Sequence, residues 1–105
     1  MAEVDRQVIE NVRTFLNKLR LAGIQISSAY LFGSYSKGLA DRWSDIDVAV
    51  VSPQISGNRF EERVRLAEMA MGIDNRIEPL PFNPETFDIE DPLVQEIIKY
   101  GVALT

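Results

Sequence analysis

The stretch from Ile46 to Val51 constrains the fold most, because it is a nearly unbroken apolar run that stops at Ser52-Pro53. An apolar run of this length, bounded by turn residues, predicts a strand that is buried within a sheet. Two acidic residues stand at its head, Asp45 just before the run and Asp47 inside it. The strand is therefore expected to form part of the hydrophobic core and to carry two acidic side chains at its start.

Helices are predicted on either side of this strand in the sequence. Apolar residues recur at helical spacing in residues 4–22 and again in residues 59–71, which predicts two amphipathic helices. Gly23 stands where a left-handed residue would close the first helix. The apolar stripes are formed by Val8, Val12, Phe15, Leu16 and Leu19 in the first helix, and by Phe60, Val64, Ala67 and Met71 in the second.

Two further strands are predicted, one in the second half of residues 24–32 and one over residues 76–82. Pro79 and Pro81 cannot donate ladder hydrogen bonds, so the later strand should lie at an edge of the sheet or be bulged. The small polar residues 34–41 predict a turn that opens a short helix. Asn83-Pro84 and Asp91-Pro92 both resemble a helix cap followed by proline, and a last helix is expected over residues 92–100. The order predicts a single small α/β domain over residues 1–105.

The composition excludes several classes of function. The 105 residues contain no cysteine and no histidine, which excludes disulfides, zinc fingers and Ser-His-Asp catalysis. Sixteen acidic against eleven basic residues give a net charge of -5, so nucleic acid is not expected as a partner. No segment approaches the roughly 18 apolar residues of a membrane span, and the charged start is no secretion signal. A cytoplasmic protein whose chemistry uses carboxylates, hydroxyls and amides is expected.

Gly33-Ser34 closes the first predicted strand and opens the polar segment. Glycine lets the backbone approach a phosphate closely, and free amides at a helix start favour anions. Ser34 adds a hydroxyl, and Lys37 places a cation one turn later. We therefore predict phosphate binding by Gly33, Ser34 and Lys37.

Asp45 and Asp47 lie two positions apart, so the period of a strand places both carboxylates on one face. Two like charges held side by side repel each other, and Mg²⁺ shared between carboxylates and substrate phosphates resolves that repulsion. Gly-Ser alone is usually a turn, Asp-x-Asp alone is commonly solvated surface, and Lys37 alone is more often a surface charge. Gly-Ser followed after ten residues by Asp-x-Asp and an apolar strand is a compound pattern that indicates function.

This compound pattern resembles the signature of the polymerase-β-like nucleotidyltransferases, and in particular of the minimal, MNT-type members. The resemblance implies a small mixed sheet with helices packed on it, with Gly33 and Ser34 at the triphosphate and Asp45 and Asp47 as metal ligands. It also implies a third carboxylate on a later strand. Glu78 is the candidate, although Asp is usual there and Pro79 follows it. Asp74 is a weaker alternative, and an exposed acid on an edge strand is the plain structural reading of Glu78.

The function implied by the resemblance is transfer of a nucleotidyl group, most simply AMP from ATP, to a hydroxyl acceptor with release of pyrophosphate. Two Mg²⁺ ions would be held by Asp45, Asp47 and Glu78, about 4 Å apart. The small size predicts that a partner supplies the acceptor, and minimal nucleotidyltransferases pair with helical HEPN proteins as antitoxins. The alternative is a non-catalytic nucleotide-binding or toxin-neutralising module. The sequence leaves open the acceptor, the base, the role of Glu78 and the oligomeric state, including a homo-oligomer.

Overall fold

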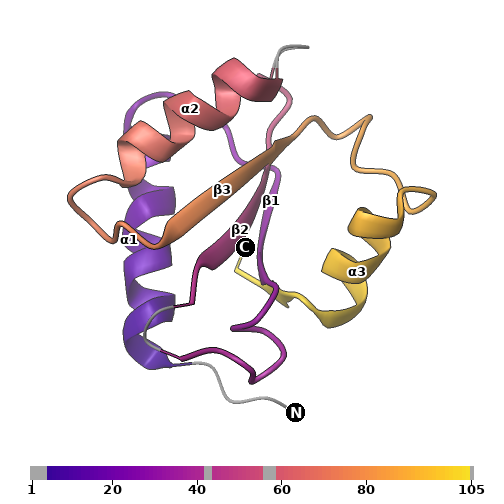
Figure 1. Cartoon of the computed structure of the whole chain (residues 1–105). Helices are drawn as coiled ribbons and strands as arrows, with labels where there is room; N and C mark the ends of the chain where they lie inside the picture. Colours follow the sequence, from indigo (N-terminus) through magenta and orange to yellow (C-terminus); the bar gives the residue numbers. More distant parts are fainter. Residues whose placement is uncertain (1–4, 42–43, 56–58, 105) are drawn as a thin grey trace.

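The computed structural model describes residues 5–41, 44–55 and 59–104, and within them three helices cover the two faces of a four-stranded mixed sheet (Figure 1). The fold class predicted from the sequence is confirmed. The elements are α1 (Arg6–Leu21), β1 (Ser28–Phe32), β2 (Ile46–Val51), α2 (Arg59–Ala70), β3 (Ile77–Phe82), α3 (Pro92–Tyr100) and β4 (Val102–Ala103).

The sheet has the strand order β3-β2-β1-β4. Strand β2 pairs antiparallel with β1 and parallel with β3, so the first residues of β2 and β3 meet the last residue of β1 at one end of the sheet. At this end Asp47 lies opposite Phe32 on one side and Glu78 on the other. Strand β3 is an edge strand, which confirms the prediction made from its prolines.

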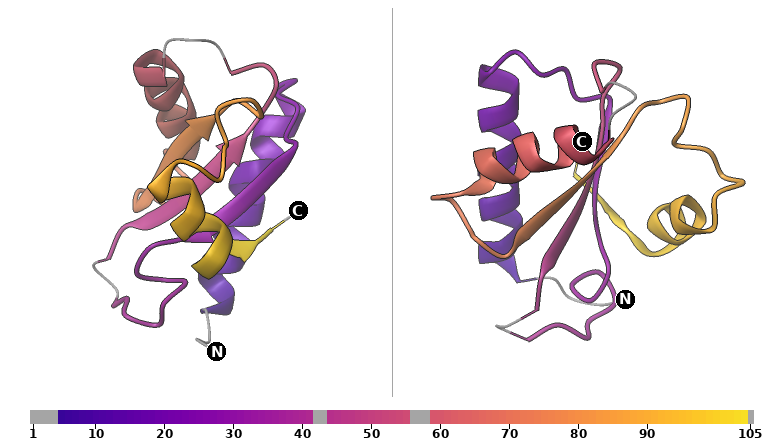
Figure 2. Two further views of the ribbon diagram at one scale, coloured as in Figure 1. Left: turned by 90° about the vertical axis from the view of Figure 1, so that its right-hand side faces the viewer. Right: turned by 45° about the horizontal axis from the view of Figure 1, so that its top comes forward.

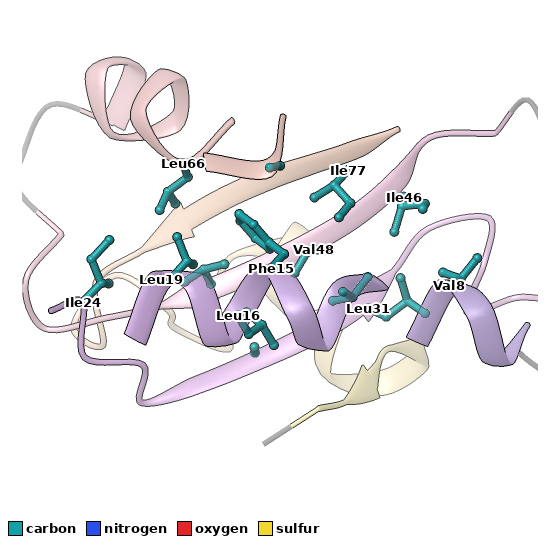
Figure 3. Close-up of a cluster of buried hydrophobic side chains, with 14 of the residues drawn as sticks. Val8, Phe15, Leu16, Leu19, Ile24, Leu31, Ile46, Val48, Leu66 and Ile77 are labelled. Atoms are coloured by element: carbon teal, nitrogen blue, oxygen red, sulfur yellow. The ribbon is translucent and has the colours of Figure 1, made fainter. Parts of the chain in front are cut away.

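Helices α1 and α2 pack on one face of the sheet (Figure 2). Phe15, Leu16 and Leu19 of α1 are almost completely buried against residues of alternate positions in the strands. Burial of each such side chain stabilises the fold by about 1.5–3 kcal/mol. We call this cluster the main core, because it has more buried members than the cluster on the other face. Its members include Val8, Phe15, Leu16, Leu19, Ile24, Leu31, Ile46, Val48, Leu66 and Ile77 (Figure 3).

Helix α3 covers part of the opposite face of the sheet (Figure 2). Its Val94 and Ile97 pack against Ala49, Val51 and Phe82. These strand residues alternate with the members of the main core, which confirms that Ile46, Val48 and Val50 point away from the face that carries Asp47. Asp47 therefore lies beyond the end of the smaller apolar cluster, on the face that α3 covers.

The helix caps follow the sequence. The side chain of Asp5 accepts a hydrogen bond from the backbone of Gln7 and starts α1, and Asp91 does the same for Leu93 at the start of α3. Gly23 has φ +89°, as predicted for the residue after α1. None of the helices among the described residues is long and apolar enough to cross a membrane.

The short helix predicted over residues 34–41 is wrong. Residues 33–38 form consecutive turns instead. The hydroxyl of Ser36 donates to the carbonyl of Gly33 at 3.0 Å, and Gly38 has φ +72°, which no helix tolerates. Serine side chains that bond to the nearby backbone compete with helix formation, which is the physical reason for the difference. The cap at Asn83 likewise starts only a turn, in which its side chain accepts from the backbone of Glu85.

Helix α2 forms as predicted, but its predicted apolar stripe does not enter the core. Phe60, Val64 and Met71 are 76%, 41% and 66% exposed, whereas Leu66 and Ala70 are buried. Leu66 and Ala70 are four residues apart and form a second apolar stripe, and this is the one that faces the sheet. Strand β4 was not predicted, because two residues paired with Tyr30 and Leu31 carry no periodic signal.

Candidate active site

Three carboxylates gather at the end of the sheet where β2 and β3 begin. Asp47 is half-buried, and its strand neighbour in β3 is Glu78. Asp45 is exposed and immediately precedes β2. The pairing of β2 with β3 thus places Glu78, the candidate for the third acid, beside Asp47.

The electrostatics of Asp47 reflect this gathering. Burial raises the pKa of Asp47 above its ordinary value, and the negative charges of Glu78 and Asp45 raise it further. The guanidinium of Arg63 opposes this rise in pKa, and its Nη2 lies 3.7 Å from Oε2 of Glu78. A group of acids whose charges disfavour one another is a place where a cation binds favourably.

Gly33 lies directly over Asp47. It has φ +74°, and a Cβ atom added to it would lie 2.3 Å from Oδ2 of Asp47. A side chain at this position would displace the Asp47 carboxylate, and the positive φ also favours glycine. The turn that begins at Gly33 and the carboxylate of β2 are therefore in direct contact.

The turn after Gly33 offers backbone donors. Within it, the amide of Lys37 donates to Gly33 and the amide of Leu39 donates to Ser34. The backbone N–H groups of Ser34, Tyr35 and Ser36 have no acceptor among the residues that the structure describes. Successive N–H groups of a turn can bind an anion without a helix. These amides can donate to an anion, although the helix start that was expected to present them is absent.

The side chain of Lys37 contacts α3. Its Nζ forms an ion pair with Oε1 of Glu96 in α3 and lies 5.4 Å from the centre of the Tyr100 ring. Both charged side chains of the pair are more than a third exposed. Lys37 thus joins the turn to α3 in this structure.

Asp74, the weaker alternative for the third carboxylate, has a structural role. Its Oδ2 lies 2.8 Å from Nη2 of Arg76, its Oδ1 accepts from Nε of the same arginine, and Asn11 of α1 donates to it as well. These hydrogen bonds lower its pKa to about 2. Hydrogen bonds from Asn11 and Arg76 thus occupy both oxygens of this carboxylate.

Sequence reasoning missed two residues near the site. Arg63 of α2 lies beside Glu78, and Arg76 donates to the hydroxyl of Tyr35 at 2.9 Å. Neither arginine belongs to a recognisable motif, and only the folded chain brings Arg63 beside Glu78 and Arg76 beside Tyr35. A groove of about 490 Å³ also adjoins Glu78, lined among others by Val64, Ala67 and Met71 of α2.

A complete metal site is not preassembled. Among the described residues, no three acidic side chains lie close enough together to hold a metal ion by themselves. Mg²⁺ characteristically takes one or two carboxylates together with substrate phosphates and water. The acids at Asp45 and Asp47, with the amides of the turn across from them, fit that kind of shared coordination.

Residues 9–103 match the profile of the nucleotidyltransferase domain family. The chain belongs to this family. No curated protein gives a significant match.

Solved structures of toxin–antitoxin pairs are similar to this chain. A toxin–antitoxin with AMP-PNP contains a chain 28% identical, with a TM-score of 0.67 over 92% of this chain and 72% of that one. A variant of the toxin–antitoxin MntA–HpeT gives 26% identity and a TM-score of 0.65, covering 89% of this chain and 71% of that one. The structure of the tri-AMPylated Shewanella oneidensis HEPN toxin in complex with MNT antitoxin gives 25% identity and a TM-score of 0.63, covering 93% of this chain and 71% of that one.

Proposed function

We propose that this nucleotidyltransferase moves AMP from ATP to a hydroxyl group on a partner protein. The observation that carries the proposal is the contact between Gly33 and Asp47, since it puts a backbone suited to phosphate against a carboxylate suited to a cation. Together they provide donors for phosphate oxygens and an acid that shares a metal ion with them.

The roles of the residues follow from their positions. Asp45 and Asp47 would hold Mg²⁺, and Glu78 would complete that site or accept the proton of the acceptor hydroxyl. When bound, Mg²⁺ supplies positive charge that stabilises both the attacking and the leaving oxygen. Gly33 and Ser34 would bind the β and γ phosphates through the turn, and Lys37 would join them after leaving Glu96.

The proposed transfer forms one bond to the α-phosphorus of ATP and breaks another. The acceptor oxygen forms a bond to the α-phosphorus of ATP. The bond between that phosphorus and the oxygen that bridges the α and β phosphates breaks, and pyrophosphate leaves. The acceptor proton passes to Glu78 or to solvent. Glu78 is exposed and borders the open groove beside α2, so an acceptor can approach it from outside the molecule.

The proposed partner is a HEPN-type protein, with this chain as its antitoxin. This is supported by the similar complex that contains an AMPylated HEPN toxin together with an MNT antitoxin. The similar toxin–antitoxin structure with AMP-PNP supports ATP as the donor. A hydroxyl of the partner, such as that of a tyrosine, is the proposed acceptor.

A second candidate is a non-catalytic module that binds nucleotide or neutralises a toxin. Two observations favour it: the side chain of Glu78 is 47% exposed and paired with Arg63, and the described acids form no three-carboxylate metal site. In that case Asp45 and Asp47 would bind nucleotide with Mg²⁺ but no transfer would follow.

The test uses ATP labelled at the α-phosphate, Mg²⁺ and the product of the reading frame next to that of this chain, which the proposal expects to be a HEPN-type protein. We expect label and the mass of one or more AMP groups on the partner, and matching release of pyrophosphate. Asp45→Asn and Asp47→Asn should abolish both, whereas Glu85→Gln, which removes an exposed acid beyond the end of the β2–β3 pair that is opposite to Asp47, should change neither. Nucleotide binding without transfer would favour the module, and full activity of Asp47→Asn would contradict the proposal.

A further inference from the structure

Arg76 connects the two halves of the candidate site. It stands between α2 and β3, immediately before Ile77. Its backbone carbonyl accepts a hydrogen bond from the amide of Ile46 at 2.8 Å, and Ile46 lies between Asp45 and Asp47. Its side chain points the other way, towards the turn that follows Gly33. One residue thus touches the carboxylate strand through its backbone and the phosphate turn through its side chain.

The side-chain connection runs through Tyr35. Nη1 of Arg76 donates to the Tyr35 hydroxyl at 2.9 Å, and that hydroxyl donates to the carbonyl of Asp41 at 3.0 Å. Tyr35 is 7% exposed, and its ring belongs to the main core. The tyrosine therefore anchors both ends of the 35–41 segment, one by its own backbone and the other by its hydroxyl.

The guanidinium itself is held in place. Asp74 binds it through both carboxylate oxygens, at 3.0 Å to Nε and 2.8 Å to Nη2, and Asn11 of α1 donates to Asp74 at 3.1 Å. A planar guanidinium bound in this two-pronged way has a fixed direction that a lysine cannot reproduce. The position of Tyr35 is therefore set from α1 and from the start of β3.

We propose that Arg76 and Tyr35 are positioning residues that hold the turn of Ser34, Tyr35 and Ser36 in register with Asp45 and Asp47. This inference rests on the proposed function and adds to it how the site keeps its geometry. The turn has no regular secondary structure of its own, so its amides need an outside support to face the phosphate at the right distance. Displacement of reacting groups by about 1 Å can reduce a rate by about 100-fold.

The test compares Tyr35→Phe and Arg76→Lys with the unaltered protein. Tyr35→Phe removes only the bridging hydroxyl, and Arg76→Lys keeps the charge but not the two-pronged geometry. We expect amide hydrogen exchange of residues 33–41 to accelerate in both variants. We also expect Mg²⁺-dependent binding of AMP-PNP to weaken and AMP transfer to slow, each by about tenfold at a temperature where all proteins are fully folded.

Two matched controls separate positioning from general stability. Tyr30→Phe removes the hydroxyl of a half-buried tyrosine outside the turn, whose ring stacks on that of Phe87 with the ring centres 5.6 Å apart. Arg20→Lys changes an exposed arginine of α1 that donates to Asn17. Both should leave exchange at residues 33–41 and nucleotide binding unchanged. The double variant Tyr35→Phe/Arg76→Lys should be no worse than the stronger single variant, because both break the same link.

The outcomes are distinct. Faster exchange of the turn together with weaker AMP-PNP binding supports the inference. Lower melting temperatures with unchanged binding and transfer would show that the network only stabilises the fold, and would overturn it. If the unaltered protein binds AMP-PNP but transfers nothing, the proposed transfer fails and the inference is decided by binding and exchange. If it binds no nucleotide at all, both fail.

Discussion

A Cβ atom on Gly33 would lie 2.3 Å from Oδ2 of Asp47, so the turn after β1 and the acid of β2 leave no room for a side chain between them. Gly33 also has φ +74°. Gly23 has a similar φ of +89°, but a Cβ there would meet nothing within 4 Å. The two glycines thus share the backbone requirement and differ only in the contact with the site.

This difference predicts the effect of alanine. Gly33→Ala and Gly23→Ala should each lose about 1–2 kcal/mol of unfolding free energy, because each forces alanine into a left-handed conformation. Only Gly33→Ala should also displace Asp47, and we expect it to reduce AMP transfer by at least about 100-fold. Urea denaturation and the transfer assay measure the two effects. Equal activity of the two variants would show that the contact has no role in the reaction.

Asp47 is predicted to reduce stability while serving the reaction. Its pKa is raised by burial and by the charges of Glu78 and Asp45, so the folded protein holds its proton more tightly than the unfolded chain does. The free energy of unfolding therefore falls as the pH rises above 3.8, the ordinary pKa of an aspartate. The fall ends once the pH exceeds the raised pKa that Asp47 has in the folded protein, because the carboxyl is then ionised in both states.

Asp47→Asn should accordingly raise the melting temperature at pH 7 in the absence of metal, and this gain should vanish near pH 3. Mg²⁺ with AMP-PNP should raise the melting temperature of the unaltered protein, because the cation relieves the repulsion, but not that of Asp47→Asn. Differential scanning fluorimetry with EDTA or Mg²⁺ tests this. A variant less stable than the unaltered protein at pH 7 would contradict the account.

The sequence was most informative where one residue type served both structure and chemistry. The apolar run 46–51 predicted a buried strand, and Pro79 and Pro81 predicted an edge strand, but the pairing that brings Glu78 beside Asp47 is set by the folded sheet. The prediction stopped at features set by tertiary contacts. The main core selects Leu66 and Ala70 over the stripe of Phe60, which period alone does not decide.

The polar turn shows the other limit. Its small residues were predicted to open a helix, but the bond from Ser36 to Gly33 and the anchor from Tyr35 to Arg76 favour turns. Arg76 lies 41 residues from Tyr35 and belongs to no motif, so no local pattern connects them.

Lys37 gives a prediction on nucleotide affinity. Its ion pair with Glu96 competes with a phosphate for the same ammonium group. Exposed ion pairs are worth at most about 1 kcal/mol, so Glu96→Gln should change the unfolding free energy little and tighten AMP-PNP binding by about two- to fivefold. Lys37→Met should weaken binding. Glu62→Gln, which alters the ion pair with Arg65 in α2, should have no effect on binding. Weaker binding by Glu96→Gln would mean that Lys37 serves the turn only through α3.

Asp74 gives a prediction on acid stability. Its hydrogen bonds with Arg76 lower its pKa from 3.8 to about 2, and its side chain is only 8% exposed. Because the folded pKa lies below the unfolded one, the stabilisation is fully present above about pH 4 and is lost as the pH falls through about 2. Asp74→Asn should therefore lower the unfolding free energy by about 2 kcal/mol at pH 7, and the difference from the unaltered protein should shrink between pH 4 and pH 2.

Glu85→Gln, an exposed acid, is the control and should show no such pH-dependent difference. Urea denaturation at several pH values measures both variants, and a difference for Asp74→Asn that stays constant down to pH 2 would show that the ion pair does not set its titration.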